Sequence, residues 1–230
     1  MTHQHEELPL FPLKMVLFPG NILPLHIFEE RYRLMVQHCL EEKSNFGVIL
    51  IKKGSEVDDQ AEPYNVGTAV RIIETDIMDD RRMNIITTGQ YRFQIKSIIN
   101  QTPYLVANVD ILNPRPPPDQ HRLSALMMRA SELYNAYEDL LSETVPDWET
   151  SKNVPQTPFH LGCHIATRLQ ITLIEKQRLL EVLPVDKFLM QEIKILRHEI
   201  QRRQATVIAE RQFKEIPTSE TPFWKNNSLN

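Results

Sequence analysis

The stretch FHLGCHIA brings three potential metal ligands together in the sequence. His160, Cys163 and His164 stand at i, i+3 and i+4, so they share one face if the segment is helical. Imidazole and thiolate are typical zinc ligands, and His38 with Cys39 could complete the shell if their helix met this one. Cysteine is also a common small buried residue, and polar residues such as His160 are common in a first helical turn. We therefore expect no metal and no other cofactor.

Other patterns that would support catalysis are incomplete. His198-Glu199 begins like the zinc-protease motif H-E-x-x-H, but Arg202 occupies the position of the second histidine. The 230 residues contain no G-x-S-x-G nucleophile elbow and no phosphate-binding G-x-x-x-x-G-K-[ST] loop. The acidic pairs Asp58-Asp59 and Asp79-Asp80 have surroundings typical of polar turns. We expect a protein with no catalytic residues, and therefore not an enzyme.

Composition limits the partners and the compartment. The net charge of −4 and a pI near 6.1 disfavour nucleic acid, which usually requires a strongly basic protein surface. The first residues, MTHQHEE, lack the features of a signal peptide, and the apolar run at 46–51 is too short to span a membrane. Two cysteines do not suggest a disulfide framework. We expect a cytoplasmic protein that does not bind a membrane.

Proline organises the segment LFPLKMVLFPGNILPLHIFEERYRLMV. Because proline fixes φ and lacks an N–H, this segment is expected to form edge strands and turns. The tetrapeptide 18–21, Phe-Pro-Gly-Asn, predicts a turn between strands at Leu8–Leu10 and Leu23–Ile27. From Glu29 to Asn45 the apolar period changes to that of a helix. The predicted buried stripe of this helix consists of Tyr32, Met35, Val36, Cys39 and Leu40.

Strand patterns dominate the next stretch of the chain. Phe46–Ile51 predicts a buried strand, and 52–65 predicts a polar loop. From Val66 to Leu112 apolar and polar residues alternate, with a hairpin tip predicted at 79–81. Such alternation is typical of an antiparallel sheet curled into a small barrel, so 6–112 is expected to be a β-rich subdomain.

Helical patterns follow a proline-rich linker at 113–118. The segment 119–213 predicts a helical subdomain with a loop at 142–156, and 214–230 predicts a flexible tail. The helix-start signals are Asp119, Thr157-Pro158, the pair Thr172 and Glu175, and Asp186. Arg203 interrupts the apolar stripe of the last helix, where that helix is expected to leave the core. The fold class is therefore α+β.

The opening segment LPLFPLKMVLFPGNILPLHIFEERYRLMV resembles the signature of the Lon N-terminal, or LON substrate-binding, domain. The similarity continues through FGVILI, VGTAVRIIE, DDRRMNIITTGQYRFQI and PYLVANVDIL, and more loosely through the helical remainder. It covers about residues 6–213. The resemblance implies a PUA-like β pseudo-barrel with one helix, followed by a helical bundle with a long C-terminal helix. Since the phosphate-binding loop is missing, we expect neither the ATPase nor the peptidase of Lon.

The resemblance implies a non-catalytic protein-binding or peptide-binding module that takes part in proteolysis or protein quality control. Its expected partners are unfolded or extended protein segments, and a protease or its substrates. The candidate peptide-binding residues are Phe11, Leu17, Phe18, Leu25 and Phe28. Phe18 is the strongest of them, because a turn is expected at the surface.

Two alternatives remain open from the sequence. An RNA-binding PUA-like protein would need a basic face. The arginines that could form this face are Arg71, Arg81, Arg82 and Arg92. A structural adaptor would instead dock to a folded partner through its helical subdomain, using exposed apolar residues beyond Arg203.

Overall fold

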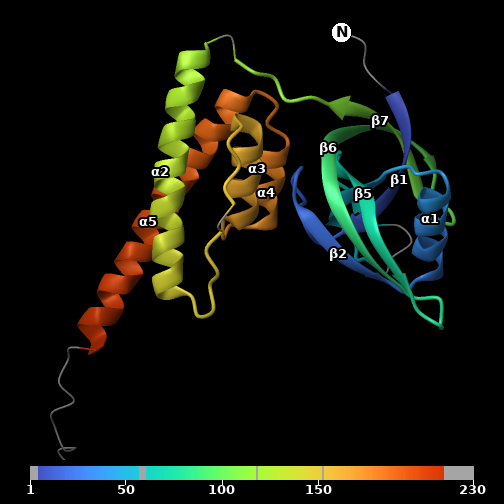
Figure 1. Ribbon diagram of the computed structural model, residues 1–230, viewed down its shortest axis with the longest axis horizontal. Coiled ribbons are helices and arrows are strands. Elements are labelled where there is room, and N and C mark those ends of the chain that lie inside the picture. Colours follow the sequence, from blue (N-terminus) through green and yellow to red (C-terminus); the bar gives the residue numbers. More distant parts are fainter. Residues whose placement is uncertain (1–4, 57–60, 118, 152, 215–230) are drawn as a thin grey trace, which may run out of the picture.

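The computed structural model describes residues 5–56, 61–117, 119–151 and 153–214 (Figure 1). In this part of the chain all named strands lie at or before Leu112, and four helices follow residue 119. The predicted tail, 214–230, lies outside the described residues from 215 onward, as do the acidic pair Asp58-Asp59 and Pro118.

The strands form one ring-like sheet rather than a strict barrel. Its elements are β1 (His5–Leu13), β2 (Ile22–Ile27), β3 (Phe46–Lys53), β4 (Glu62–Pro63), β5 (Val66–Ile77), β6 (Met83–Asn100) and β7 (Leu105–Leu112). The order is β1-β7-β6-β5-β3-β4, and a parallel pairing of β1 with β3 closes the ring. β2 pairs with the first half of β6, outside this path. The predicted 52–65 loop is shorter than expected, since β3 extends to Lys53 and β4 pairs with it.

Close packing fills the interior of the ring. Phe93 is fully buried there, together with Leu10 and Ile49. Gly47 and Gly67 make room for its ring, since a Cβ at either position would lie 2.6 Å from Phe93 Cζ. Glycine at these two positions therefore lets neighbouring strands approach the aromatic ring.

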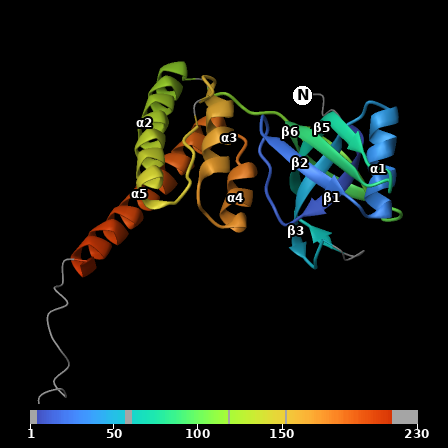
Figure 2. The same cartoon turned by 60° about the horizontal axis from the view of Figure 1, so that its bottom comes forward.

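Helix α1 (Glu30–Glu41) lies against the ring on the side away from the other helices (Figures 1 and 2). The predicted stripe is largely confirmed, because Tyr32, Met35, Val36 and Cys39 are buried. Phe11 packs on Tyr32 with ring centroids 4.0 Å apart, which ties the helix to β1. Leu40 differs from the prediction, since it is exposed at the rim of the helix.

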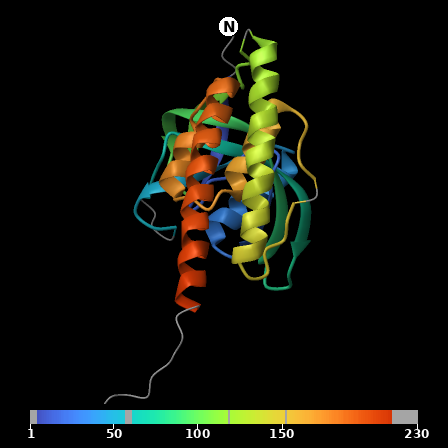
Figure 3. The ribbon, with the colours of Figure 1, turned by 90° about the vertical axis from the view of Figure 1, so that its left-hand side faces the viewer.

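The helical part comprises α2 (Gln120–Thr144), α3 (Pro158–Arg168), α4 (Leu173–Leu180) and α5 (Val185–Lys214). α2 and α5 lie side by side, and α3 and α4 stand between them and the sheet (Figures 1 and 3). The predicted loop 142–156 begins later than expected because α2 continues to Thr144. The last apolar side chain fully buried along α5 is Leu196, while Glu199 is also buried and Ile200 is partly buried, so the helix leaves the core close to Arg203, as its apolar pattern indicated.

Helix caps agree with the sequence in two cases and differ in two. Asp119 accepts a hydrogen bond from the Arg122 N–H at 3.0 Å, and Thr172 with Glu175 forms the expected capping box. Thr157 precedes α3, but its hydroxyl contacts His160 instead of a backbone N–H. Asp186 is not a cap, because α5 already begins at Val185 and Asp186 lies in its first turn.

Residues of both parts contribute to the junction between sheet and helices. Phe18 is 1% exposed and stacks on Phe188 of α5, with ring centroids 6.4 Å apart. Gln177 of α4 donates from its side-chain amide to the Val66 carbonyl at 3.0 Å. The predicted turn after Phe18 is present, with Gly20 at φ 84°, but it lies against the helical part. The surface position expected for Phe18 is therefore wrong, because α3 and α5 cover this turn.

Candidate functional site

An apolar groove lies between α1 and the hairpin that joins β5 to β6. Leu34 and Leu40 of α1 line one side, and Ile77 and Met83 of the hairpin line the other. Ile77 is 61% exposed, Leu34 46% and Leu40 37%, whereas Met83 is buried. The polar rim consists of Glu30, Arg33, Gln37 and Arg81. The groove, here called the α1 groove, has a volume of about 410 Å³.

A second hollow lies on the outer face of the same sheet end. It runs across β2, β6 and β5 and has a volume of about 460 Å³. We call it the outer hollow; its lining residues are Pro24, Leu25, His26, Glu74, Thr75, Asp76, Asn84, Ile85 and Ile86. Because successive strand residues point to opposite faces, Asp76 lines the outer hollow while Ile77 lines the α1 groove.

Phe28 lies directly after β2 and before α1, between His26, which lines the outer hollow, and Glu30, which lines the α1 groove. Its side chain is 58% exposed, and its ring stacks on His26 with centroids 6.0 Å apart. The preceding residue, Ile27, pairs with Met83, which pairs in turn with Ile77, so Phe28 lies at the same end of the sheet. An exposed phenylalanine between two hollows is a large apolar contact available to a partner.

The five candidate peptide-binding residues separate into two groups. Phe11, Leu17 and Phe18 are buried, so they cannot contact a peptide in this conformation, and their selection as contact residues is wrong. They belong to the packing between β1, α1 and the helical part. Leu25 is half-buried in the outer hollow and Phe28 is exposed. Peptide contact by these two remains a proposal.

Among the exposed large apolar residues that the sequence did not indicate are Leu34 of α1 and Ile73 and Ile77 of β5. Leu34 lies off the predicted buried stripe of α1, so the helical pattern could have indicated that this apolar side chain is exposed. Ile73 and Ile77 follow a register shift in β5, and the apolar pattern of the sequence does not show that the strand extends past its neighbours.

The potential metal ligands of α3 do not converge. His160 Nδ1 lies 2.7 Å from the Thr157 hydroxyl, and His164 Nε2 lies 2.9 Å from the Tyr134 hydroxyl. Burial raises the pKa of the Cys163 thiol, which disfavours the thiolate that a metal requires. Cys39 lies on α1, across the sheet from α3 (Figure 1). Over the described ranges, no cluster of three or more His, Cys, Asp or Glu side chains could hold a metal.

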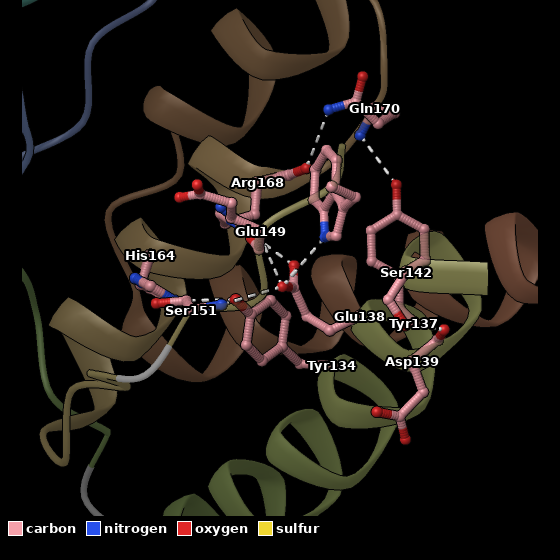
Figure 4. A network of polar contacts seen from close by, with 11 residues as sticks. Tyr134, Tyr137, Glu138, Asp139, Ser142, Glu149, Ser151, His164, Arg168 and Gln170 are labelled. Carbon is pink, nitrogen blue, oxygen red and sulfur yellow. Dashed lines mark hydrogen bonds and ion pairs between the residues drawn. The ribbon is translucent and has the colours of Figure 1, made fainter. Parts of the chain in front are cut away.

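The most extensive polar network of the helical part has a structural role (Figure 4). Arg168 donates two hydrogen bonds to the Glu138 carboxylate, at 3.0 and 2.7 Å, and stacks over the Trp148 ring. The Trp148 indole and the Ser151 N–H also donate to Glu138. Burial raises the pKa of Glu138, but the bonds and charge of Arg168 outweigh it and hold the pKa below its usual value. The network fastens the α2–α3 loop to both helices.

The basic face expected for RNA binding is incomplete. Arg92 is buried at the junction, where it donates to the carbonyls of Leu180 and Val182. Arg82 binds Asp80 within the hairpin. Arg71 and Arg81 are exposed. The four arginines therefore do not form one surface, because the fold uses Arg92 inside the protein.

The fold and these hollows define a class of protein: a ring-like sheet joined to a helical bundle, with an exposed apolar surface at the far end of the sheet. The sequence profile of the ATP-dependent protease La (LON) substrate-binding domain matches residues 7–198. The chain belongs to this family.

Similar proteins agree with this assignment. The Lon protease of Anaeromyxobacter dehalogenans is 28% identical over 177 residues, which cover 76% of this chain but 21% of that protein. A Lon N-terminal domain protein from Xanthomonas campestris superimposes with a TM-score of 0.60 at 27% identity, covering 81% of this chain and 96% of that structure. The N-terminal domain of Mycobacterium avium complex Lon protease shares the fold, with a TM-score of 0.59 at 15% identity.

The matched region is thus the substrate-binding module of Lon and not its ATPase or peptidase. No helix in the described part of the chain is both long and apolar enough to cross a membrane.

Proposed function

We propose that this protein is a non-catalytic module that binds unfolded or extended segments of other proteins and acts in proteolysis or protein quality control. The observation that carries this proposal is the apolar surface at the end of the sheet. Leu34 of α1 and Ile77 of β5 line the α1 groove, and the exposed Phe28 lies at the same end of the sheet, between β2 and α1. Family membership supports the same conclusion.

The chemistry of this surface suits an unfolded chain. Unfolded segments expose apolar side chains, which a folded partner normally buries, and the hollows offer apolar walls with a polar rim. Burying one large apolar side chain contributes about 1.5–3 kcal/mol, so several such contacts together are needed to offset the entropy cost of association and give a measurable affinity. No sequence-specific polar pocket is required for that affinity.

Docking to a folded partner through the helical part is a second candidate. Ile174 of α4 and Met190 of α5 are 53% and 44% exposed. A hollow between the two helices lies nearby, lined by Leu179, Ile195 and charged residues. An adaptor would use this surface and leave the end of the sheet free.

Binding of a fluorescently labelled, reduced and alkylated model protein, followed by anisotropy, tests the first proposal. Phe28→Ser and Ile77→Ser should each weaken binding about tenfold, the equivalent of about 1.4 kcal/mol of lost apolar contact. Ile174→Ser removes an equally exposed side chain from the helical part and should leave the affinity unchanged.

Repeating the binding measurement at increasing salt concentration separates protein binding from RNA binding. Apolar binding should persist from 50 to 500 mM salt, whereas binding of single-stranded RNA through phosphates would fall steeply. Equal affinity of Phe28→Ser and the unaltered protein for the unfolded polypeptide would contradict the proposed surface. Loss of binding only in Ile174→Ser would instead favour the helical surface.

A further inference from the structure

One edge of strand β5 is open over half of its length. β3 covers β5 at Thr68–Val70, and from Arg71 to Ile77 the only strand of the described chain that pairs with β5 is β6. The outer edge of 71–77 therefore has no strand partner within the described ranges. Unpaired strand edges bind extended peptides by backbone hydrogen bonding.

The hairpin geometry shows which backbone groups face this open edge. Met78 N–H donates to the Arg82 carbonyl at 2.9 Å, which makes this a hydrogen-bonded pair. Because such pairs alternate along an antiparallel ladder, Asp76 and Glu74 bond to β6, and Thr75 and Ile77 direct their N–H and C=O groups outward. No proline interrupts residues 71–77, so both of these outward donors are present.

The edge of β2 is less suitable for the same purpose. Gly89 N–H donates to the Asn21 carbonyl at 2.9 Å, so the alternation places Pro24 at a position facing away from β6. Proline has no N–H, and an added strand would find no donor there. The open edge of β5 is therefore the better template.

Side chains at this edge specify the chemistry of the added segment. Glu74 and Asp76 are exposed on the outer face and form no ion pair with any described residue. On the opposite face, Ile77 lines the α1 groove together with Leu34 and Leu40. A strand lying here would place alternate side chains beside the two carboxylates and in the apolar groove. Arginines at the rim of the groove, Arg33 and Arg81, disfavour a basic side chain on the apolar face.

We infer that the open edge of β5 binds an extended protein segment in which basic and apolar residues alternate, by strand addition between β5 and α1. This inference rests on the proposed function and specifies the substrate class. The register shift between Ile72 and Glu74 limits regular pairing to the stretch from Glu74 to Ile77. The recognised core is therefore about four residues long, or about 13 Å of extended chain.

Three synthetic peptides with identical flanks test the inference. The first carries Lys-Ile-Lys-Ile, the second has the same residues in the order Lys-Lys-Ile-Ile, and the third carries Glu-Ile-Glu-Ile. The alternating basic peptide should bind at least about tenfold more tightly than the other two, because only it meets both faces in register. Anisotropy of labelled peptides on the full chain gives the dissociation constants.

Matched variants test the edge itself. Thr75→Pro removes an outward N–H but leaves the hydrogen bonds of the neighbouring residues to β6, so it should abolish binding of the alternating peptide. Thr75→Ala retains the N–H and should retain binding of this peptide. Glu74→Lys with Asp76→Lys should weaken the basic peptide at least about tenfold and strengthen the acidic one. Asp139→Lys with Glu143→Lys makes the same charge change on an exposed face of α2 and should have no effect.

The outcomes separate the inference from the proposed function. Equal binding of the alternating and block peptides would overturn strand addition, as would retained binding in both the Thr75→Pro and the charge-reversed variants. If the unfolded model protein still binds and still depends on Phe28, the proposed function stands without the β5 edge. If the unfolded model protein and all three peptides fail to bind, both proposals are wrong.

Discussion

Two ionisable side chains are buried close to the junction between sheet and helices. Arg92 reaches from β6 to the carbonyls of Leu180, at the end of α4, and Val182, and stacks over the Phe159 ring, 4.8 Å from its centroid. Glu192 of α5 is fully buried, and neither of its oxygens has a hydrogen-bond partner among the residues that the structure describes. Burial raises the pKa of Glu192 well above its usual value, which outweighs the effect of the nearby Ala166 backbone. Glu192 is therefore a neutral acid inside the fold.

The buried Glu192 makes stability depend on pH. In the unfolded chain this carboxyl loses its proton above about pH 4.3, while the folded protein keeps it, so raising the pH favours unfolding. The free energy of unfolding should fall by about 1.4 kcal/mol per pH unit from this group alone until the raised folded pKa is reached. Glu192→Gln should remove this slope.

Urea unfolding of both proteins between pH 5 and pH 8 measures the difference. The stability advantage of Glu192→Gln over the unaltered chain should grow with pH until the raised pKa of the folded state is reached. Parallel curves would show that Glu192 is ionised in the folded state, or that the unfolded state binds the same number of protons.

The starts of α3 and α4 show that similar sequence signals can lead to different capping interactions. The Thr172 hydroxyl accepts from the Glu175 N–H at 3.3 Å, and the Glu175 side chain accepts from the Thr172 N–H at 2.9 Å. Thr157 stands at the equivalent position before α3 without a side-chain bond to the backbone. The sequence predicted both starts, but only one of these threonines satisfies a backbone donor.

Alanine substitution should separate these two threonines. Thr172→Ala should lower the free energy of unfolding by about 1 kcal/mol, because it leaves a helix N–H without its partner. Thr157→Ala should cost clearly less, because it loses only the contact with His160. Urea titration at pH 7 compares the two, and an equal loss in both would contradict a special role for the capping box.

At the scale of the whole molecule, sheet and helices share one apolar cluster. Phe18 and Val66 from the β-rich part are buried in the same cluster as Tyr134 and Phe188 from the helical part. Because Phe18 and Val66 complete the core of the helical part, the two parts should unfold together. The connection between them is therefore tighter than the proline-rich linker alone would provide.

Arg92→Met tests this connection. Removing the guanidinium leaves the Leu180 and Val182 carbonyls without their donors, so stability should fall by about 2–4 kcal/mol. The exposed Arg129→Met, on the outer side of α2, should change stability little. Circular dichroism in a urea series measures both, and a loss in Arg92→Met no larger than in Arg129→Met would contradict the structural role of Arg92.

The sequence by itself determined the elements, the family and the absence of recognisable catalytic motifs. Apolar period, proline positions and capping residues depend on neighbours a few residues away, so α1, the hairpin tip and the capping box could be predicted. The tertiary structure decided which faces are covered. Phe18 is buried because α5 packs on its turn, and Ile77 is exposed because β5 extends beyond β3. Such burial depends on contacts between residues far apart in the chain, which periodicity does not encode.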